Sequence, residues 1–312
     1  MRIALIGLAA FCAKTLEALI KAGEEVVVVG TAPEPDRGKP VADAAQAAGI
    51  PCIQPSRWRD PDVYKKFSGY APDLGVMAFV NDKLPGNILR CPRLGTIEYH
   101  PSLLPRHRGS SAINWAIIQG ESRTGLTIFW VDEGMDTGPI LLQKPVDVSP
   151  DDTVGSIYFN TLFPKGIEAI VESVKLVREG KAPRITQDNS KATYEPPIQE
   201  SHGLIDWAKP VDDVYNLIRG TNPQPGATTS YKGKKLKVFD SGRRFDLDKT
   251  LVSGAKVTQP GAIIDINADG FVVAANGGVI QIKRVQPEGS GKTPSKDFVA
   301  QSGLGIGDKL GS

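Results

Sequence analysis

Residues 2–30 read RIALIGLAAFCAKTLEALIKAGEEVVVVG, a stretch in which an apolar run, a helical pattern and a second apolar run follow one another. The runs from Arg2 to Gly7 and from Val26 to Gly30 are typical of buried strands, and the pattern from about Phe11 to Ala22 is typical of a helix. Two buried strands joined by a helix predict a parallel pair with the helix on one face. The start of the chain is therefore interpreted as a strand and not as a secretory signal.

The same alternation continues through the first half of the chain. Further buried runs are predicted at Leu74 to Phe79, Gly95 to His100 and Thr127 to Val131, and a long amphipathic helix from Ile157 to Glu179. The predicted fold class is α/β, with a doubly wound and mainly parallel sheet. Because ligands bind at the carboxyl ends of the strands in such sheets, candidate catalytic residues are expected directly after these runs.

A change of composition marks a second, smaller domain. Residues 182–204 are rich in Pro, Ser, Asn and Gln and lack a hydrophobic period, which is typical of a linker. After them, short apolar runs are separated by turns, and Asn276-Gly277-Gly278 predicts a hairpin. We expect a catalytic domain over residues 1–181 and a β-barrel of the oligonucleotide-binding type over residues 205–312.

Composition and charge narrow the class of protein. With 40% apolar and 23% charged residues and no run near the ~20 apolar residues of a membrane span, the chain is expected to be soluble, without a membrane partner. Three widely spaced cysteines predict neither a disulfide framework nor a metal knuckle, so the expected location is the reducing cytoplasm. Residues 207–312 carry 15 basic and 10 acidic side chains, against 22 and 25 in the rest, which is compatible with a polyanionic partner for the second domain.

The turn after the first predicted strand argues against a dinucleotide site. It matches the G-x-G-x-x-G fingerprint only at Gly7, because Ala9 and Cys12 occupy the other two glycine positions. A tight turn from strand to helix explains Gly7 better than a nucleotide site does. An NAD-linked enzyme stays open as an alternative.

Residues 96–109, TIEYHPSLLPRHRG, hold two of the chain's three histidines. Alternation along a strand would place Glu98 and His100 on one face and Ile97 and Tyr99 on the other. A carboxyl group and an imidazole at one end of a sheet could act as an acid/base pair. A structural histidine beside a solvated carboxylate fits the same residues.

A second polar constellation follows the run that ends at Val131. Glycines flank Asp136 in the stretch from Asp132 to Gly138, so a tight loop could hold its carboxylate at a fixed position. His100, His107 and Asp136 are possible metal ligands by type. Their spacing matches no known ligand set, and no metal is predicted.

The stretch from His100 to Gly109, followed by residues 111–115 and by Asp136-Thr137-Gly138, resembles the signature of the formyltetrahydrofolate-dependent formyltransferase family. The resemblance extends over essentially the whole chain, including Asp206-Trp207 and residues 218–223, which are similar to the start of the family's C-terminal domain. It implies a Rossmann-like catalytic domain, 10-formyltetrahydrofolate as the formyl donor, and no metal.

The resemblance also implies roles for individual residues. His100 would stabilise the tetrahedral intermediate or move a proton. Asp136 would orient His100 or activate the attacking water or amine. Glu98 is a third candidate catalytic residue because it shares the face of His100. Folate contacts are implied for two segments, Asp82-Lys83-Leu84 and Ser102-Leu103-Leu104-Pro105.

Two branches of the family fit the sequence. In one, related to the hydrolase domain of 10-formyltetrahydrofolate dehydrogenase, water or a small acceptor receives the formyl group. In the other, methionyl-tRNA formyltransferase, initiator tRNA would be the partner of the C-terminal domain. The mildly basic C-terminal part favours tRNA, but the short loop 31–39 offers only Arg37 and Lys39 as basic residues. A non-catalytic folate- or RNA-binding module is the alternative from another class.

Glu98 departs from the transferase pattern. That branch places an asparagine two residues before the catalytic histidine, where its amide can donate to the formyl oxygen. An ionised Glu98 would repel this oxygen, so it must be protonated, paired with protonated His100, or turned away. The departure favours the hydrolase branch, which also lacks the asparagine.

Overall fold

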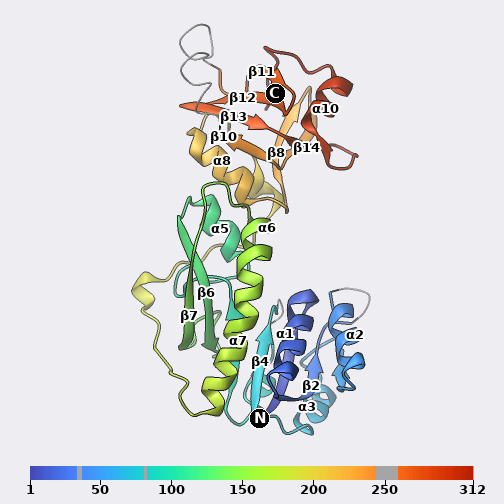
Figure 1. The fold of residues 1–312 in the computed structure, drawn as a ribbon, viewed down its shortest axis with the longest axis vertical. Coiled ribbons are helices and arrows are strands. Elements are labelled where there is room, and N and C mark those ends of the chain that lie inside the picture. Colours follow the sequence, from blue (N-terminus) through green and yellow to red (C-terminus); the bar gives the residue numbers. More distant parts are fainter. Residues whose placement is uncertain (34–36, 81–82, 244–258, 312) are drawn as a thin grey trace. The chain divides into compact units, whose positions relative to one another are not determined.

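The computed structural model describes residues 1–33, 37–80, 83–243 and 259–311, and these form two compact units (Figure 1). The first unit comprises residues 1–112, 124–146 and 159–195, and the second comprises 113–123, 147–158 and 196–312. The segment expected to be a linker is thus divided, since residues 182–195 pack with the first unit. The boundaries of independently folding domains stay a prediction.

The first unit is built on a seven-stranded sheet, whose strands are β1 (Arg2–Gly7), β2 (Glu25–Gly30), β3 (Cys52–Ile53), β4 (Leu74–Ala78), β5 (Thr96–His100), β6 (Arg123–Trp130) and β7 (Ile140–Asp147). Their order in the sheet is β3-β2-β1-β4-β5-β6-β7. The first five strands in this order pair in parallel, and β6 runs antiparallel to β5. The predicted doubly wound, mainly parallel sheet is confirmed.

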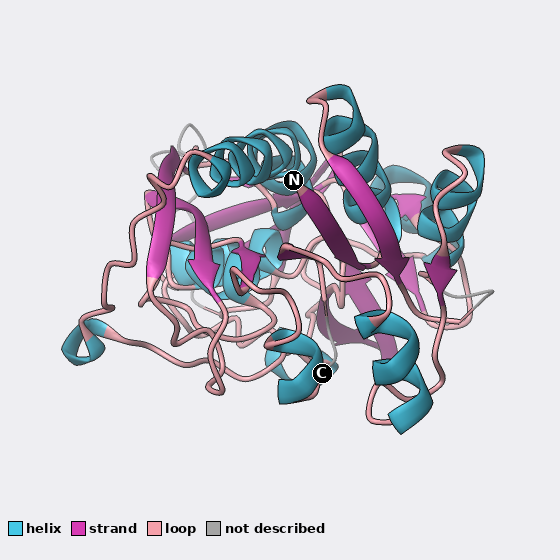
Figure 2. Cartoon of the chain, turned by 90° about the horizontal axis from the view of Figure 1, so that it is seen from below, coloured by secondary structure: helices cyan, strands magenta, loops and turns pink. Residues whose placement is uncertain are grey.

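Helices cover both faces of this sheet (Figure 2). They are α1 (Ala9–Lys21), α2 (Lys39–Ala47), α3 (Pro61–Ser68), α4 (Gly86–Leu89) and α7 (Phe163–Arg178), whereas α5 (Ala112–Ile118) belongs almost wholly to the second unit. Helix α1 packs against α2 and α7, and Phe11 on α1 lies 4.6 Å from the Tyr99 ring of β5. On the other face Phe67 of α3 and Ile88 of α4 pack against Met77 of β4. No helix in the described ranges combines the length and apolar composition needed to cross a membrane.

Several elements differ from the sequence prediction, and three of the differences have a local physical reason. The helix expected over 157–179 is divided into α6 (Val154–Ile157), a π-helix (Tyr158–Leu162) and α7, because Pro164 in the first turn of α7 has no N–H to donate to the preceding turn. Strand β7 was not predicted because Gln143-Lys144-Pro145 interrupts its apolar pattern. Strand β8 (Ala227–Tyr231) was missed because threonine and serine fill it.

The second unit contains antiparallel strands, as predicted. Helix α8 (Val211–Gly220) precedes two four-stranded sheets, with orders β10-β13-β12-β11 and β15-β14-β9-β8. Besides β8, the strands and the last helix are β9 (Lys234–Val238), β10 (Ser241–Arg243), β11 (Ile263–Asn267), β12 (Gly270–Ala275), β13 (Gly278–Ile282), β14 (Arg284–Pro287), β15 (Thr293–Pro294) and α10 (Ser295–Ser302). Ala275 pairs with Gly278, which confirms the hairpin predicted at Asn276-Gly277.

The turn from β1 to α1 requires a glycine because other backbone passes close to it. A Cβ atom at Gly7 would lie 1.9 Å from the carbonyl oxygen of Ala78 and 2.8 Å from Cys12 Sγ. We expect Gly7→Ala to lower the free energy of unfolding by about 2–3 kcal/mol, as overpacking does, in urea denaturation. Gly69→Ala is the control, since its Cβ would meet nothing closer than 3.4 Å, and it should change stability by less than about 0.5 kcal/mol. Equal stability of the two variants would contradict the requirement for a glycine at residue 7.

Candidate active site

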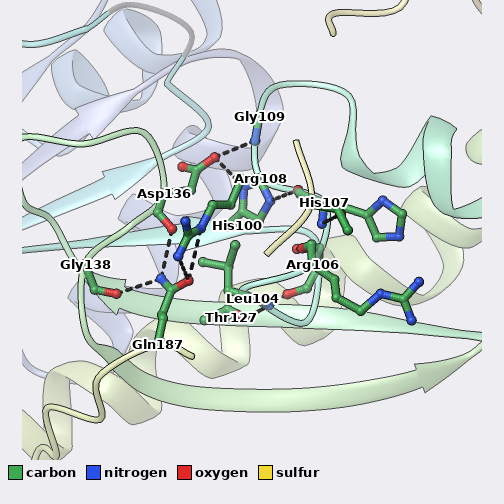
Figure 3. A network of polar contacts seen from close by, with 12 residues as sticks. His100, Leu104, Arg106, His107, Arg108, Gly109, Thr127, Asp136, Gly138 and Gln187 are labelled. Carbon is green, nitrogen blue, oxygen red and sulfur yellow. Dashed lines mark hydrogen bonds and ion pairs between the residues drawn. The ribbon is translucent and has the colours of Figure 1, made fainter. Parts of the chain in front are cut away.

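His100 and Asp136 meet at the carboxyl end of β5 (Figure 3). His100 is the last residue of this strand, and Asp136 lies in the loop between β6 and β7. The distance from His100 Nδ1 to Asp136 Oδ2 is 3.7 Å, and the two side chains are 8% and 14% exposed. The structure thus brings together the two residues that the sequence singled out, while their catalytic roles stay a prediction.

A backbone carbonyl fixes the orientation of the His100 ring. His100 Nε2 lies 2.8 Å from the carbonyl oxygen of His107, and a carbonyl can only accept a hydrogen bond. Nε2 therefore carries a proton, and Nδ1 is the ring nitrogen that faces Asp136. The distance of 3.7 Å is longer than a hydrogen bond. His100 Nδ1 and the Asp136 carboxylate are therefore not hydrogen-bonded to each other, and both can interact with a reactant.

The loop around Asp136 is held by contacts to its main chain. Asp136 adopts a left-handed conformation with φ of 55°, and its Oδ2 accepts a hydrogen bond of 2.7 Å from the N–H of Gly109. Gln187 Nε2 donates to the carbonyl oxygens of Asp136 and Gly138, at 2.8 and 2.7 Å. A Cβ at Gly138 would lie 1.7 Å from the carbonyl oxygen of Trp130, so this loop crosses β6 closely.

Glu98 lies on the same face of β5 as His100, as alternation predicted. On the opposite face Tyr99 packs against Phe11, whereas the Thr96 hydroxyl on the face of Glu98 donates to the carbonyl of Leu89 at the end of α4. Glu98 is half-buried. This burial raises the pKa of the Glu98 carboxyl well above its usual range, and the negative charge of Asp136 raises it further. Glu98 therefore keeps its proton to a higher pH than a solvated glutamate.

The segment from Ser102 to Pro105 is anchored by hydrogen bonds. The buried Ser102 hydroxyl donates to the carbonyl of Arg106 at 2.6 Å, and the N–H of the buried Leu104 donates to Thr127 Oγ1 at 3.1 Å. Leu103 and Pro105 are half-buried and are the two members with side chains partly open to solvent. Folate contacts for these four residues stay a prediction.

The other predicted folate segment lies beside the Asp136 loop. Lys83 is exposed, and its Nζ donates to the carbonyl oxygen of Glu133 at 3.2 Å. Leu84 is buried with Phe67 and Ile88 in the core on this face of the sheet. Asp82, the third residue of this prediction, lies outside the described residues.

Sequence reasoning missed a segment that runs along the His100 loop, residues 185–195, which we call the strap. Its Thr193 accepts the N–H of His107 on Oγ1 at 2.8 Å and the N–H of Arg108 on its carbonyl at 3.0 Å. Its Glu195 places Oε1 3.2 Å from Nδ1 of the buried His107. These contacts hold His107, whose carbonyl orients the His100 ring.

Arg108 is the main anchor of the strap. Its buried guanidinium group donates from Nη2 to Gln187 Oε1 at 2.7 Å and to Asn189 Oδ1 at 2.8 Å, and from Nη1 to the Tyr194 hydroxyl. Side-chain hydrogen bonds hold residues 185–195 in place, so this part of the predicted linker needs no hydrophobic period. The only indication of these contacts in the sequence is the glutamine, asparagine, threonine and tyrosine of this segment.

Two other kinds of site receive no support. Among residues 1–33, 37–80, 83–243 and 259–311, no three His, Cys, Asp or Glu side chains group in a way that could hold a metal ion. Shallow grooves of about 490 and 460 Å³ lie along α1 and α7, on the Tyr99 side of the sheet and away from His100. Lys14 and Glu17 in the larger groove pair with each other, and most of its other lining residues are apolar.

Both parts of the chain match family models. Residues 1–174 match the model described as formyl transferase, and residues 197–303 match the formyl transferase C-terminal domain. These two ranges include the candidate site and most of the second unit.

Two proteins of known name are similar over nearly the whole chain. The cytosolic 10-formyltetrahydrofolate dehydrogenase of Xenopus laevis is 38% identical over 307 residues, which are 96% of this chain and 34% of that protein. The methionyl-tRNA formyltransferase of Geotalea uraniireducens (strain Rf4) is 36% identical over 318 residues, which are 100% of this chain and 98% of that protein. The chain thus spans about a third of the dehydrogenase and nearly all of the transferase.

The fold also resembles a solved structure. HypX from Aquifex aeolicus, crystallised with tetrahydrofolic acid, superimposes with a TM-score of 0.70 at 19% identity, over 99% of this chain and 48% of that one. At this identity the likeness concerns the fold alone.

Proposed function

Because the chain belongs to the formyl transferase family, we propose that it removes the formyl group from 10-formyltetrahydrofolate and passes it to water or to a small amine. The observation that carries this proposal is the 3.7 Å approach of His100 Nδ1 to Asp136 Oδ2 at the end of β5. An imidazole and a carboxylate at this spacing, both mostly buried, can share the proton transfers of acyl transfer.

The reaction requires two bond changes and two proton movements. With water as acceptor, a bond forms between the water oxygen and the formyl carbon, and the bond from this carbon to the folate nitrogen breaks. Asp136 accepts the proton of the attacking water, and protonated His100 donates a hydrogen bond from Nδ1 to the oxygen on which negative charge develops. The folate nitrogen takes up the proton held by Asp136 as it leaves, which gives tetrahydrofolate and formic acid, and the acid ionises to formate in solution.

We assign Glu98 a role in its protonated form. Because burial raises the pKa of this carboxyl, it favours the protonated form, and protonated Glu98 can donate a hydrogen bond where an ionised glutamate would repel the developing charge. Its position on the His100 face of β5 supports a second donor to the formyl oxygen. Glu98 would then replace the asparagine amide of the transferase branch.

The folate is proposed to lie between the two segments of the first unit that flank this site. Lys83 is held beside the Asp136 loop by its contact to Glu133, and its ammonium group is exposed to a ligand. Leu103 and Pro105 supply partly exposed apolar surface after β5. Ser102 and Leu104 would act through the loop conformation because both side chains are buried.

Incubation with 10-formyltetrahydrofolate, with and without charged initiator tRNA, tests the proposed function. We expect tetrahydrofolate and formate, or a formylated small amine, to appear without tRNA. Formylation that appears only with tRNA would replace this function by that of the transferase branch. Folate binding without any formyl release would show a non-catalytic module.

Methionyl-tRNA formylation is the second candidate, because the Geotalea transferase matches from end to end. Local ion pairs in the second unit reduce the positive charge available to tRNA. Lys235 and Lys237 share Glu200, and Arg284 pairs with Asp240, so two carboxylates offset part of the charge of three cations.

Salt dependence of tRNA binding separates the two candidates. A surface that contacts 6–10 phosphates loses about 10³–10⁵ in affinity between 50 and 200 mM salt, because binding releases counterions. Given the local pairing, we expect weak binding of initiator tRNA with a small salt slope in filter-binding titrations. Tight binding at low salt with a steep slope would favour the tRNA substrate.

A further inference from the structure

One buried amide connects the Asp136 loop to the strap. Gln187 is 5% exposed, and its Nε2 donates to the carbonyl oxygens of both Asp136 and Gly138 (Figure 3). Its Oε1 accepts from Arg108 Nη2 at 2.7 Å and from Arg108 Nε at 3.2 Å. Both N–H donors and the acceptor of this side chain are therefore engaged.

These contacts form a closed ring that includes the Asp136 carboxylate. Arg108 donates to Gln187 Oε1, and the next residue, Gly109, donates its N–H to Asp136 Oδ2. The Asp136 carbonyl oxygen accepts from Gln187 Nε2, which closes the ring. The ring fixes Asp136 at both its carbonyl and its carboxylate. Because Asp136 has a φ of 55°, which side chains rarely adopt, such external contacts are needed to keep this conformation.

The two halves of the Gln187 side chain serve different partners. The nitrogen holds the Asp136 loop, and the oxygen satisfies Arg108, whose side-chain acceptors are the neutral groups of Gln187, Asn189 and Tyr194. A substitution that changes only the nitrogen therefore separates a role toward Asp136 from a role in holding the buried guanidinium.

We propose that Gln187 is a positioning residue that sets the Asp136 carboxylate at its working distance from His100 Nδ1. This inference rests on the proposed role of Asp136 in formyl release. It gives one residue of the strap, Gln187, an effect on catalysis through the geometry of the Asp136 loop.

Gln187→Glu is the decisive variant. Glutamate keeps an oxygen acceptor for Arg108 and turns this contact into an ion pair, but it removes both N–H donors to the Asp136 loop. We expect kcat for formyl release to fall about 10- to 100-fold, because small displacements of catalytic groups have such effects. KM for 10-formyltetrahydrofolate should change less than about twofold. The thermal midpoint should fall less than in Gln187→Ala, because the ion pair with Arg108 offsets part of the cost of leaving two carbonyl oxygens without a donor.

Two further variants complete the experiment, with kcat measured at a temperature at which every variant is folded. Gln187→Ala should lose as much kcat as Gln187→Glu and also have a lower thermal midpoint, since it leaves Arg108 with fewer acceptors. Asn189→Ala removes an acceptor of Arg108 without touching the Asp136 loop, so it should lower the midpoint and keep kcat.

The outcomes distinguish this inference from the proposed function. Wild-type kcat in Gln187→Glu, or an equal loss in Asn189→Ala, would show that the strap only stabilises Arg108 and would overturn the inference. Asp136→Asn is assayed in parallel. If Asp136→Asn keeps kcat, the proposed function fails; if it loses kcat while Gln187→Glu does not, only the inference about Gln187 fails.

Discussion

His100→Ala and Asp136→Ala are each expected to lower kcat for formyl release by about 10²- to 10⁴-fold, the usual contribution of a positioned acid or base. His100 loses the Nδ1 donor that would face the formyl oxygen, and Asp136 loses the carboxylate that would take the proton of the attacking group. Steady-state production of tetrahydrofolate measures the effect. Both variants should keep the circular dichroism and folate affinity of the wild type, because both residues lie at loop and strand ends outside the hydrophobic clusters.

Asp136→Asn is the matched control for the geometry of this site. Its amide oxygen can still accept the Gly109 N–H, so the loop keeps its contact, but the side chain can no longer accept a proton. We expect nearly the same loss of kcat as in Asp136→Ala. Near-normal turnover in His100→Ala or Asp136→Ala would rule out the proposed mechanism.

Glu98→Ala is expected to lower the rate of formyl release by about 10²- to 10³-fold, the cost of removing one donor to a developing oxyanion. Glu98→Gln should retain most of the activity, because its amide still donates. The pH profile tests which form of Glu98 is active. The wild type should be active below the raised pKa of Glu98 and lose activity as pH rises through it. In Glu98→Gln this decrease of activity at high pH should be absent. Identical rates and profiles in all three proteins would place the side chain outside the site.

Stability should follow the same titration. Between the usual pKa of a glutamate and the raised pKa of Glu98, the folded state holds a proton that the unfolded state has lost. The free energy of unfolding therefore falls as pH rises through this window. Urea denaturation at several pH values should show this slope for the wild type and a smaller slope for Glu98→Gln.

Hydrophobic periodicity accounts for what the sequence predicted of the fold. Buried runs at β1, β2, β4 and β5 alternate with amphipathic helices, and this pattern requires a parallel sheet covered on both faces. Period-two alternation in β5 also placed Glu98 with His100 correctly. Strands β7 and β8 escaped prediction because polar residues and a proline occupy positions that an apolar pattern would need.

The site was predictable only where its residues form local motifs. His100 and Asp136 stand in short stretches with recognisable neighbours; His100 ends one predicted strand, and Asp136 follows another. The contact between Arg108 and Gln187 joins residues 79 positions apart through a single amide and a guanidinium group. Such a hydrogen bond leaves no hydrophobic period, and the polar composition of residues 185–195 was interpreted as that of a linker.

Each of the two units is formed by three separate stretches of the chain, which limits the chimeras that can be made between relatives. Residues 113–123 and 147–158 belong to the second unit, where Asn114 Nδ2 donates to the carbonyl of Gly220 and Asp151 accepts from the Tyr215 hydroxyl. A chimera made by one crossover near residue 181 would separate these groups from their native partners and would exchange Gln187 as well. Transfer of the second unit between relatives therefore requires three separate stretches to be exchanged together.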